Sequence, residues 1–100
     1  MPKGCLLVRA IVAEDDRPRF DEWYRDEHLP QAKAAFGAER AWRGWSRTSP
    51  GEHVACYEFA TLAEAEALAT SAALAGMVAE FDRCWGGRVT RSRDILEVAA

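Results

Sequence analysis

The segment that decides the fold is a helix that we predict from the stretch FDEWYRDEHLP, residues 20–30. At about 100° per residue, one side of this helix would carry mostly aromatic side chains and one carboxylate, namely Phe20, Trp23, Tyr24, Glu27 and Gln31. His28 would lie at the margin of that side. Because an aromatic side packs on the core, Glu27 and His28 need partners there. Either a neighbouring donor and a water satisfy them, or the helix carries them into a pocket.

Pro30 follows closely, and its effect depends on whether the helix runs through it. A proline inside a helix leaves the carbonyl four residues earlier without a partner, here that of Asp26, and kinks the axis just past His28. We predict a continuous, kinked helix. The alternative is that Pro30 begins a separate helix, where a proline in the first turn is favourable.

The composition is that of one folded domain, residues 1–100. Hydrophobic residues make up 49% of the chain and charged residues 29%, which excludes a disordered protein. No apolar run reaches the roughly 18 residues of a membrane span. The N-terminal residues lack the features of a signal peptide, and the three cysteines have no CxxC or metal-like spacing. We therefore expect a cytoplasmic protein with reduced thiols and no membrane partner.

Outward from the first helix, the sequence predicts the element order βαββαβ. Four segments have strand character, and they span residues 5–12, 38–47, 54–59 and 89–98. This order commonly gives a ferredoxin-like α+β fold, with a four-stranded antiparallel sheet, the first and third strands central, and two helices on one face. The apolar first and third segments agree with central positions. We interpret the arginines at and near the last strand, Arg88, Arg91 and Arg93, as a solvated edge rather than an anion site.

Local signals predict where the two helices begin and break. Asp15 and Asp16 are candidates for the N-cap of the first helix, with a proline in the first turn behind them. The second helix opens with a capping box at residues 61–64. We expect it to break near residues 70–71 or at Gly76 and then to resume.

The helices can cover only one face of the sheet, so the other face needs a partner. The first strand leaves two possibilities for that face, and these are Leu7 with Ile11, or Leu6 with Val8 and Val12. An apolar face of this size is not left in water, and a second copy of the chain is the simplest cover. We therefore predict a homodimer, with sheet against sheet, that buries at least about 1,000 Å².

The central stretch also resembles a known family. The F-x3-Y-x3-H-x-P pattern of the EthD-like proteins, in the dimeric α+β barrel superfamily, is matched by Phe20, Tyr24, His28 and Pro30. Gly37, Trp42 and residues 57–59 fit looser parts of that pattern. The resemblance implies a homodimer with a pocket between helices and sheet. The superfamily includes cofactor-independent monooxygenases, lactone isomerases and haem-degrading enzymes, and the EthD group is linked to oxidative degradation without a settled reaction.

Candidate site residues follow from this helix and the neighbouring strands. His28 is the candidate proton donor or acceptor, because an ordinary pKa near 6.5 suits proton transfer at neutral pH. Tyr24 and Glu27 would orient His28 or the ligand. Four further residues would contact the substrate, and these are Trp23, Arg9, Arg43 and Tyr57. In the alternative interpretation, His28 is hydrogen-bonded in place and holds the helix on the sheet.

We predict no bound cofactor, no metal and no nucleic acid. His28 and His53 are far apart in the sequence and show no metal-ligand spacing, and haem enters only by analogy with the superfamily. RNA-recognition modules share the βαββαβ order, but Val54 and Cys56 occupy the positions where aromatic side chains would stack on bases. The formal charge of −3 also argues against a general nucleic-acid binder.

The sequence therefore predicts a small homodimeric protein that binds an apolar or aromatic small molecule in a pocket between helices and sheet. Two activities remain open for it. One is that of a cofactor-independent oxidoreductase or isomerase in a degradation or biosynthetic pathway. The other is that of a non-catalytic dimeric ligand-binding or accessory protein.

Overall fold

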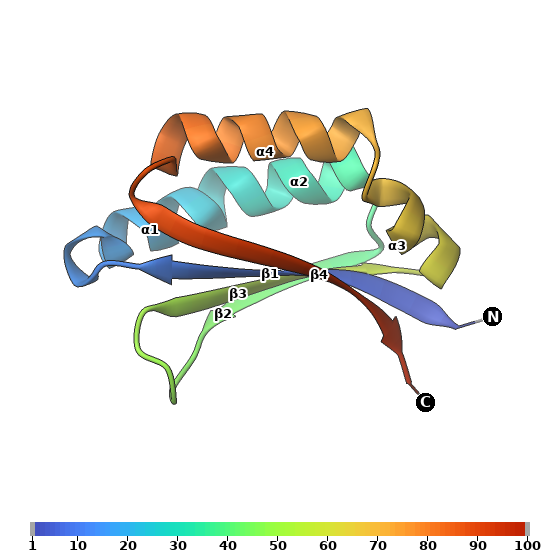
Figure 1. Ribbon diagram of the computed structural model, residues 1–100, viewed down its shortest axis with the longest axis horizontal. Coiled ribbons are helices and arrows are strands. Elements are labelled where there is room, and N and C mark those ends of the chain that lie inside the picture. The colour runs from blue at the N-terminus through green and yellow to red at the C-terminus, as the bar shows by residue number, and fades with distance from the viewer. Residues whose placement is uncertain (1, 100) are drawn as a thin grey trace.

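The computed structural model describes residues 2–99 and has the predicted antiparallel sheet with helices on one face (Figure 1). The strands are β1 (Lys3–Val12), β2 (Arg40–Trp45), β3 (Glu52–Phe59) and β4 (Val89–Val98), in the spatial order β2-β3-β1-β4. The helical segments are η1 (Glu14–Asp16), α1 (Arg17–Trp23), η2 (Tyr24–His28), α2 (Leu29–Phe36), α3 (Leu62–Leu68) and α4 (Ala72–Trp85). The ferredoxin-like α+β fold, with β1 and β3 central, is confirmed.

The side chains of β1 alternate between the two faces of the sheet. Leu6 and Val8 face the helices and belong to the main hydrophobic core. Cys5 and Leu7 lie on the opposite face, where they form a smaller cluster with Cys56 of β3. Both sets are buried, because β1 lies between β3 and β4 and its side chains are flanked by those of the neighbouring strands. This double burial explains why the sequence of β1 is an almost unbroken apolar run.

Helices α1 and α2 are joined by η2 into one continuous helical segment, as predicted. The backbone keeps helical dihedral angles through this junction, and the N–H of Leu29 donates to the carbonyl of Tyr24, five residues earlier. Such a π-helical turn is wider than an α-helical one. Its position is significant, because the ring of Pro30 would clash with the carbonyl of Asp26 in a regular α-helix. The irregularity predicted near Pro30 is therefore a widened turn immediately before it.

The inward side of this helical segment repeats every fourth residue. Its members are buried or half-buried, and they are Phe20, Tyr24, His28, Ala32 and Phe36. In an α-helix a spacing of four residues drifts by about 40° at each step, and the wide turn η2 takes up part of that drift. The predicted phase of the helix is thus wrong for three residues. Glu27 and Gln31 are exposed, whereas His28, expected at the margin, is buried.

Both ends of this helical segment are fixed by specific residues. Gly37 ends α2 in the left-handed conformation, with a φ of 68°, which glycine adopts without strain. Asp16 stands before α1, but the prediction that an aspartate side chain caps this helix is wrong. Its carboxylate instead accepts a hydrogen bond from Arg88, 2.5 Å away, and so ties the start of α1 to the loop before β4.

The second helical region is divided as the sequence suggested. The side chain of Thr61 accepts a hydrogen bond from the N–H of Glu64, which confirms the capping box at the start of α3. The break falls just before Ser71, which caps α4, and α4 runs through Gly76. Gly4 allows α3 to lie close to β1, because a Cβ at this position would be 2.7 Å from the Cα of Leu62.

The other face of the sheet is uncovered, as Figure 1 shows beneath the strands. We call it the open face. It carries the exposed large hydrophobic side chains of the described residues, and these are Ile11, Trp42, Leu96 and Val98. Of the two possibilities for β1, Leu7 with Ile11 is therefore correct. Between residues 2 and 99, no single helix is long and apolar enough to cross a membrane; α3 and α4 meet the length and composition criteria only as a bent pair.

Candidate ligand site

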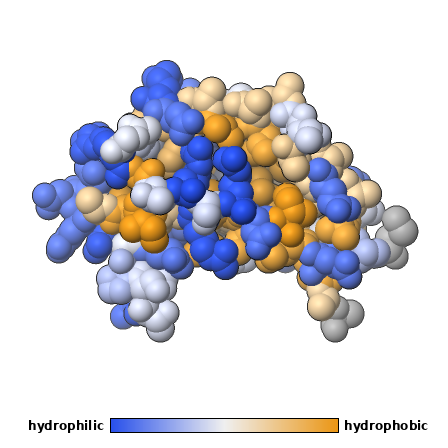
Figure 2. Space-filling view, in the orientation of Figure 1, coloured by the Kyte–Doolittle hydropathy of each residue, from blue (hydrophilic) through white to orange (hydrophobic). Residues whose placement is uncertain are grey.

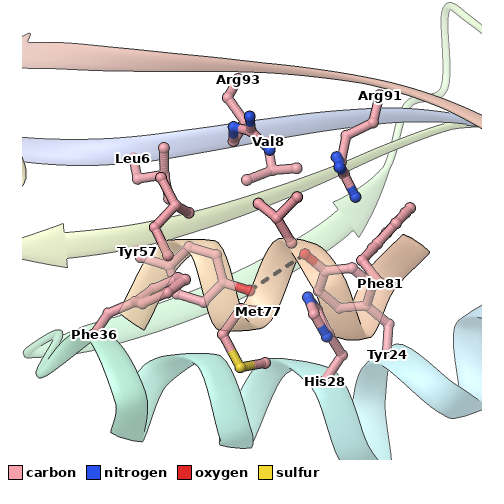
Figure 3. A pocket seen from close by; sticks show the side chains of 12 residues that line it. Leu6, Val8, Tyr24, His28, Phe36, Tyr57, Met77, Phe81, Arg91 and Arg93 are labelled. Carbon is pink, nitrogen blue, oxygen red and sulfur yellow. Dashed lines mark hydrogen bonds between the residues drawn. The ribbon is translucent and has the colours of Figure 1, made fainter. Parts of the chain in front are cut away.

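A cavity lies between the sheet and the helices, where β4 runs beside α4 (Figure 3). The space there is about 310 Å³, a volume that includes open solvent at the cavity mouth. The enclosed part is narrow and has room for little more than one water molecule. Its walls are mostly apolar and include Leu6, Val8, Phe36, Met77, Val78 and Phe81. Polar side chains enter this space from η2, β3 and β4.

Two tyrosine hydroxyl groups meet inside the cavity. Tyr24 comes from η2 and Tyr57 from β3, and their hydroxyl oxygens are 3.2 Å apart (Figure 3). Burial raises the pKa of Tyr24 to about 12 and also raises the pKa of Tyr57, so both stay protonated at neutral pH. Since one hydroxyl donates to the other, the pair keeps one O–H that can donate to a third group.

His28 is held between aromatic rings beside the tyrosine pair. Its imidazole stacks on the indole of Trp23 with a centroid separation of 4.6 Å, and the ring of Tyr24 lies edge-on at 4.9 Å. Residues 2–99 offer no hydrogen-bond partner to its buried Nδ1. Burial, helped by the positive charge of Arg91, lowers the pKa of His28 to about 4. The imidazole is therefore neutral at pH 7 and able to accept a proton.

Two arginines reach the cavity from β4. The guanidinium of Arg91 lies 4.2 Å from the ring centre of Phe81, and its Nη2 donates to Asp82 Oδ1 at 3.1 Å. Arg93, two residues further along the strand, lines the same cavity. In Figure 2 hydrophilic side chains cover the middle of β4, with hydrophobic ones on either side. Arg93 is exposed on this edge strand, as predicted for a solvated edge, whereas Arg91 is half-buried, and both border the cavity.

His53 contacts Tyr24 and belongs to a second group of polar side chains next to the cavity. The buried ring of His53 lies 4.5 Å from the ring of Tyr24, and its Nε2 is 3.3 Å from Arg43 Nη1. Arg43 donates to Asp21 at 2.7 Å, and Trp45 donates to the same carboxylate oxygen at 2.8 Å. Burial, followed by the charge of Arg43, lowers the pKa of His53 to about 4. These side chains fix the position of α1 relative to β2 and β3.

Of the residues predicted for the site, the cavity brings together His28, Tyr24 and Tyr57. The side chain of Trp23 does not line it and instead packs on the His28 ring. These residues converge because η2 turns His28 inward and the alternation of β3 turns Tyr57 towards the helices. The catalytic role proposed for His28 therefore has a structural setting in which to act.

The remaining predicted residues lie outside the cavity. Glu27 is exposed on the outer side of the helix, because the wide turn η2 rotates it outward. Arg9 is exposed on the open face, since its neighbours in β1 face the helices, so the expectation that it enters the pocket is wrong. Arg43 does face the helices, but it pairs with Asp21 and does not line the cavity.

Sequence reasoning considered the two arginines of β4 and His53 but did not place them at the site. The available signal was the alternation of β4. Arg91 pairs with Ala10 of β1, and Arg93 with Val8, which faces the helices. A β4 aligned antiparallel to β1 in this register puts both guanidinium groups on the cavity side. His53 had no comparable signal, because its proximity to Tyr24 arises only from the tertiary packing.

The polar groups around the cavity form a set of hydrogen-bond donors. They comprise a neutral imidazole, two phenolic hydroxyl groups and two guanidinium groups, and the residues that line the cavity include no carboxylate. Such a set can hold an oxygen anion by hydrogen bonds while His28 accepts or returns a proton. Within residues 2–99, no three His, Cys, Asp or Glu side chains are grouped so that they could hold a metal ion.

No protein-family model matches the sequence, and no curated protein matches it. Solved structures with the same fold do match over nearly the whole chain. An EthD family protein from Bacillus halodurans has a TM-score of 0.67 at 15% identity, over 99% of this chain and 100% of its own. A putative antibiotic biosynthesis monooxygenase from Nitrosomonas europaea has a TM-score of 0.64 at 22% identity, over 96% of this chain and 89% of its own. A NIPSNAP family protein of unknown function from Agrobacterium tumefaciens has a TM-score of 0.68 at 17% identity, over 97% and 88% of the two chains.

At these identities the likeness concerns the fold alone. It agrees with the resemblance of residues 20–30 to the EthD pattern, which rests on the sequence. The chain therefore has the ferredoxin-like fold that an EthD family protein, a putative monooxygenase and a NIPSNAP family protein share.

Proposed function

We propose that this protein binds an apolar or aromatic small molecule in the cavity between helices and sheet, and that it is an enzyme of the oxidoreductase or isomerase type. The observation that carries the proposal is the convergence of His28 and the Tyr24–Tyr57 pair on one apolar cavity. A neutral imidazole can accept a proton from the ligand. The free tyrosine O–H and the arginines can stabilise the negative charge that develops.

The names of two solved structures agree with this class of reaction. One protein of the same fold is called a putative monooxygenase, and another, from Bacteroides thetaiotaomicron, a possible oxidoreductase. An isomerase would return the proton that His28 removes to a different atom of the ligand. An oxidoreductase that uses molecular oxygen would instead pass electrons from the deprotonated ligand to the oxygen, which is reduced. Oxygen consumption during turnover separates the two.

The second candidate is a non-catalytic ligand-binding or accessory protein. It is favoured by the packing of His28, whose ring is stacked against Trp23 and contacts Tyr24 edge-on, as in a residue that holds a helix in place. In that case, His28→Gln would change ligand affinity but there would be no turnover to lose. An enzyme would bind the ligand in the His28→Gln form and lose turnover by about 10²-fold or more.

Ligand binding itself is tested by filling the cavity. Met77 lines the cavity from α4, and Met77→Trp should occupy the space and abolish binding of a small aromatic probe such as naphthalene. Ala75→Trp is the matched control, because Ala75 is exposed on the same helix and does not line this cavity. Titration calorimetry should show binding for the control and none for Met77→Trp. Equal binding by both variants would contradict the proposed site.

We also propose that the protein is a homodimer that pairs through the open face. The reason is the exposure of large apolar side chains there, which reaches 50% for Ile11, 43% for Trp42 and 46% for Val98. A monomer would leave this apolar patch in water. Light scattering at micromolar concentration should give twice the chain mass, and Ile11→Glu should give the monomer mass. Ala75→Glu, on the exposed side of α4, should leave the mass unchanged.

A further inference from the structure

We propose that the ligand of this cavity carries a carboxylate, and that Arg91 and Arg93 bind it. The inference rests on the proposed function, because it names the chemical class that the same cavity would accept. The ligand would have an apolar body that lies against the walls and one anionic end at β4. The two arginines would thus determine both which molecules enter and how they are oriented.

The positions of the two guanidinium groups support this role. Arg91 and Arg93 are two residues apart in one strand, so their side chains emerge on the same face of the sheet and both line the cavity. Figure 3 shows both extending from β4 over the cavity, with Arg91 directed towards Tyr24 and His28. A planar guanidinium offers paired N–H donors that match the two oxygens of a carboxylate.

The ion pairs that these arginines form within residues 2–99 neutralise little of their positive charge. Arg91 is 15% exposed, and its only ion-pair partner in residues 2–99 is Asp82, whose side chain is 56% exposed. Because the Asp82 side chain is mostly in solvent, it gives Arg91 only weak compensation, and a ligand anion can take its place. Arg93 forms no ion pair within residues 2–99. A half-buried cation beside an apolar cavity favours an anion as the group that enters.

The rest of the cavity fits the other parts of such a ligand. The apolar body would pack on Leu6 and Val8 of β1 and on Met77, whose flexible thioether can move to enlarge the narrow space. The end away from the carboxylate would then approach Tyr57 and His28.

The test uses three probes built on one hydrocarbon, and these are naphthoate, its methyl ester and naphthol. At pH 7.5 only naphthoate is charged, while all three have the same apolar body. Titration calorimetry should show that naphthoate binds at least about tenfold more tightly than the ester or naphthol, as expected for charge-assisted hydrogen bonds. The preference should weaken as salt is added, because part of the site is open to solvent.

Two variants assign the preference to the arginines. Arg91→Gln and Arg93→Gln should each lower the affinity for naphthoate several-fold and leave the affinity for the ester unchanged. Arg47→Gln is the control, because it removes the same charge from an exposed residue far from β4 in the sequence and outside the cavity. Arg93 is exposed, so its variant should fold even if loss of the Arg91–Phe81 contact unfolds the other.

Each outcome decides the matter. Preference for naphthoate that Arg93→Gln reduces and Arg47→Gln does not would support the proposal. Equal binding of all three probes would overturn the carboxylate preference while leaving the cavity as a ligand site. Tighter binding of naphthol would assign the site to phenols instead. If none of the three probes binds, both the carboxylate proposal and the proposed ligand site fail.

Discussion

The guanidinium Nη1 of Arg43 lies 2.7 Å from Asp21 Oδ1, and this ion pair ties α1 to the edge strand β2. The hydrogen bond from Arg43, with a second from Trp45, lowers the pKa of Asp21 below its ordinary value of 3.8. A carboxyl whose pKa is lower in the folded state stabilises the protein above the unfolded pKa. That contribution is lost as the pH falls through the folded value.

Asp21→Asn should therefore lower the free energy of unfolding at pH 7 by about 0.5–1 kcal/mol, a value reduced by the partial exposure of the pair. The difference from the unmodified protein should shrink as the pH falls below the ordinary pKa of 3.8, because Asp21 is then protonated first in the unfolded chain and at lower pH, at its lowered pKa, in the folded protein. Urea unfolding across this pH range measures both effects. A difference that stays constant from pH 7 to pH 3 would contradict the assignment.

The two buried histidines should make the protein less stable in mild acid. Their pKa values of about 4 lie below the ordinary value of 6.5, so the unfolded chain binds more protons between these limits. The free energy of unfolding should fall as the pH is lowered from about 6.5 to about 4, by roughly 1–3 kcal/mol for each histidine. Arg91 and Glu80 face His28 with opposite charges, and Arg43 and Asp21 face His53.

His28→Gln and His53→Gln should each flatten this pH dependence, whatever their effect at pH 7. Nuclear magnetic resonance of the unmodified protein gives the direct measurement, since neither imidazole should titrate above pH 5. An imidazole of His28 that titrates near 6.5 would show that its ring is solvated rather than buried.

The Tyr24–Tyr57 hydrogen bond should be visible as a coupling energy. Tyr24→Phe leaves the buried hydroxyl of Tyr57 without this partner, which should reduce the free energy of unfolding by about 1–3 kcal/mol. The double variant should lose less than the sum of the two single losses, by about 1 kcal/mol. Urea unfolding of the unmodified protein, the two single variants and the double variant gives this coupling energy. Strict additivity would mean that the hydroxyls do not interact.

Pro30→Ala should leave the fold intact and should not lower the Tm. Pro30 is exposed, and the helix already passes through it by means of the wide turn η2. Alanine supplies an N–H that the helix can use and is the better helix former. A clear drop in Tm would instead favour a separate helix that begins at Pro30. Ala34→Pro, on an exposed position of α2, is the contrasting control and should lose about 3 kcal/mol of stability.

Much of the topology could be predicted because it depends on patterns that tertiary packing does not change. The order of helices and strands follows from periodicity, and the central positions of β1 and β3 follow from their apolar composition. The capping box at Thr61 and the end of the first helical segment at Gly37 were equally local signals. Each of these features is determined by a few residues that are neighbours in the sequence.

The faces of β1 could not be assigned from its sequence. A strand buried on both faces shows no alternation, so nothing marked Leu6 as helix-facing and Leu7 as open-face. Arg9 was assigned to the wrong face for the same reason. A charged residue within an apolar run indicates an unusual position, but it does not indicate on which face of the sheet the side chain lies. The face was decided only by the register between β1 and its neighbours.

The phase of the first helix failed for a different reason. A regular period of 3.6 residues carries Glu27 inward and leaves His28 at the edge, whereas the π-helical turn reverses the two. The spacing of Phe20, Tyr24 and His28 at intervals of four residues was the clue. Four residues exceed the 3.6 residues of an α-helical turn. Side chains at this spacing therefore stay on one side of the helix only if a turn is wider at some point along it.

Strand β1 separates the proposed ligand cavity from the open face by the thickness of a single backbone. Leu6 and Val8 line the cavity, while Cys5 and Leu7, which alternate with them along the strand, belong to the other side. Substitutions at one set can therefore adjust ligand choice without touching the surface on the far side. A shift of one residue in the pairing of β1 would exchange the two sets at once. We infer that single-residue insertions or deletions in this strand are far more damaging than point substitutions, and that the length of β1 is under stricter constraint than its composition.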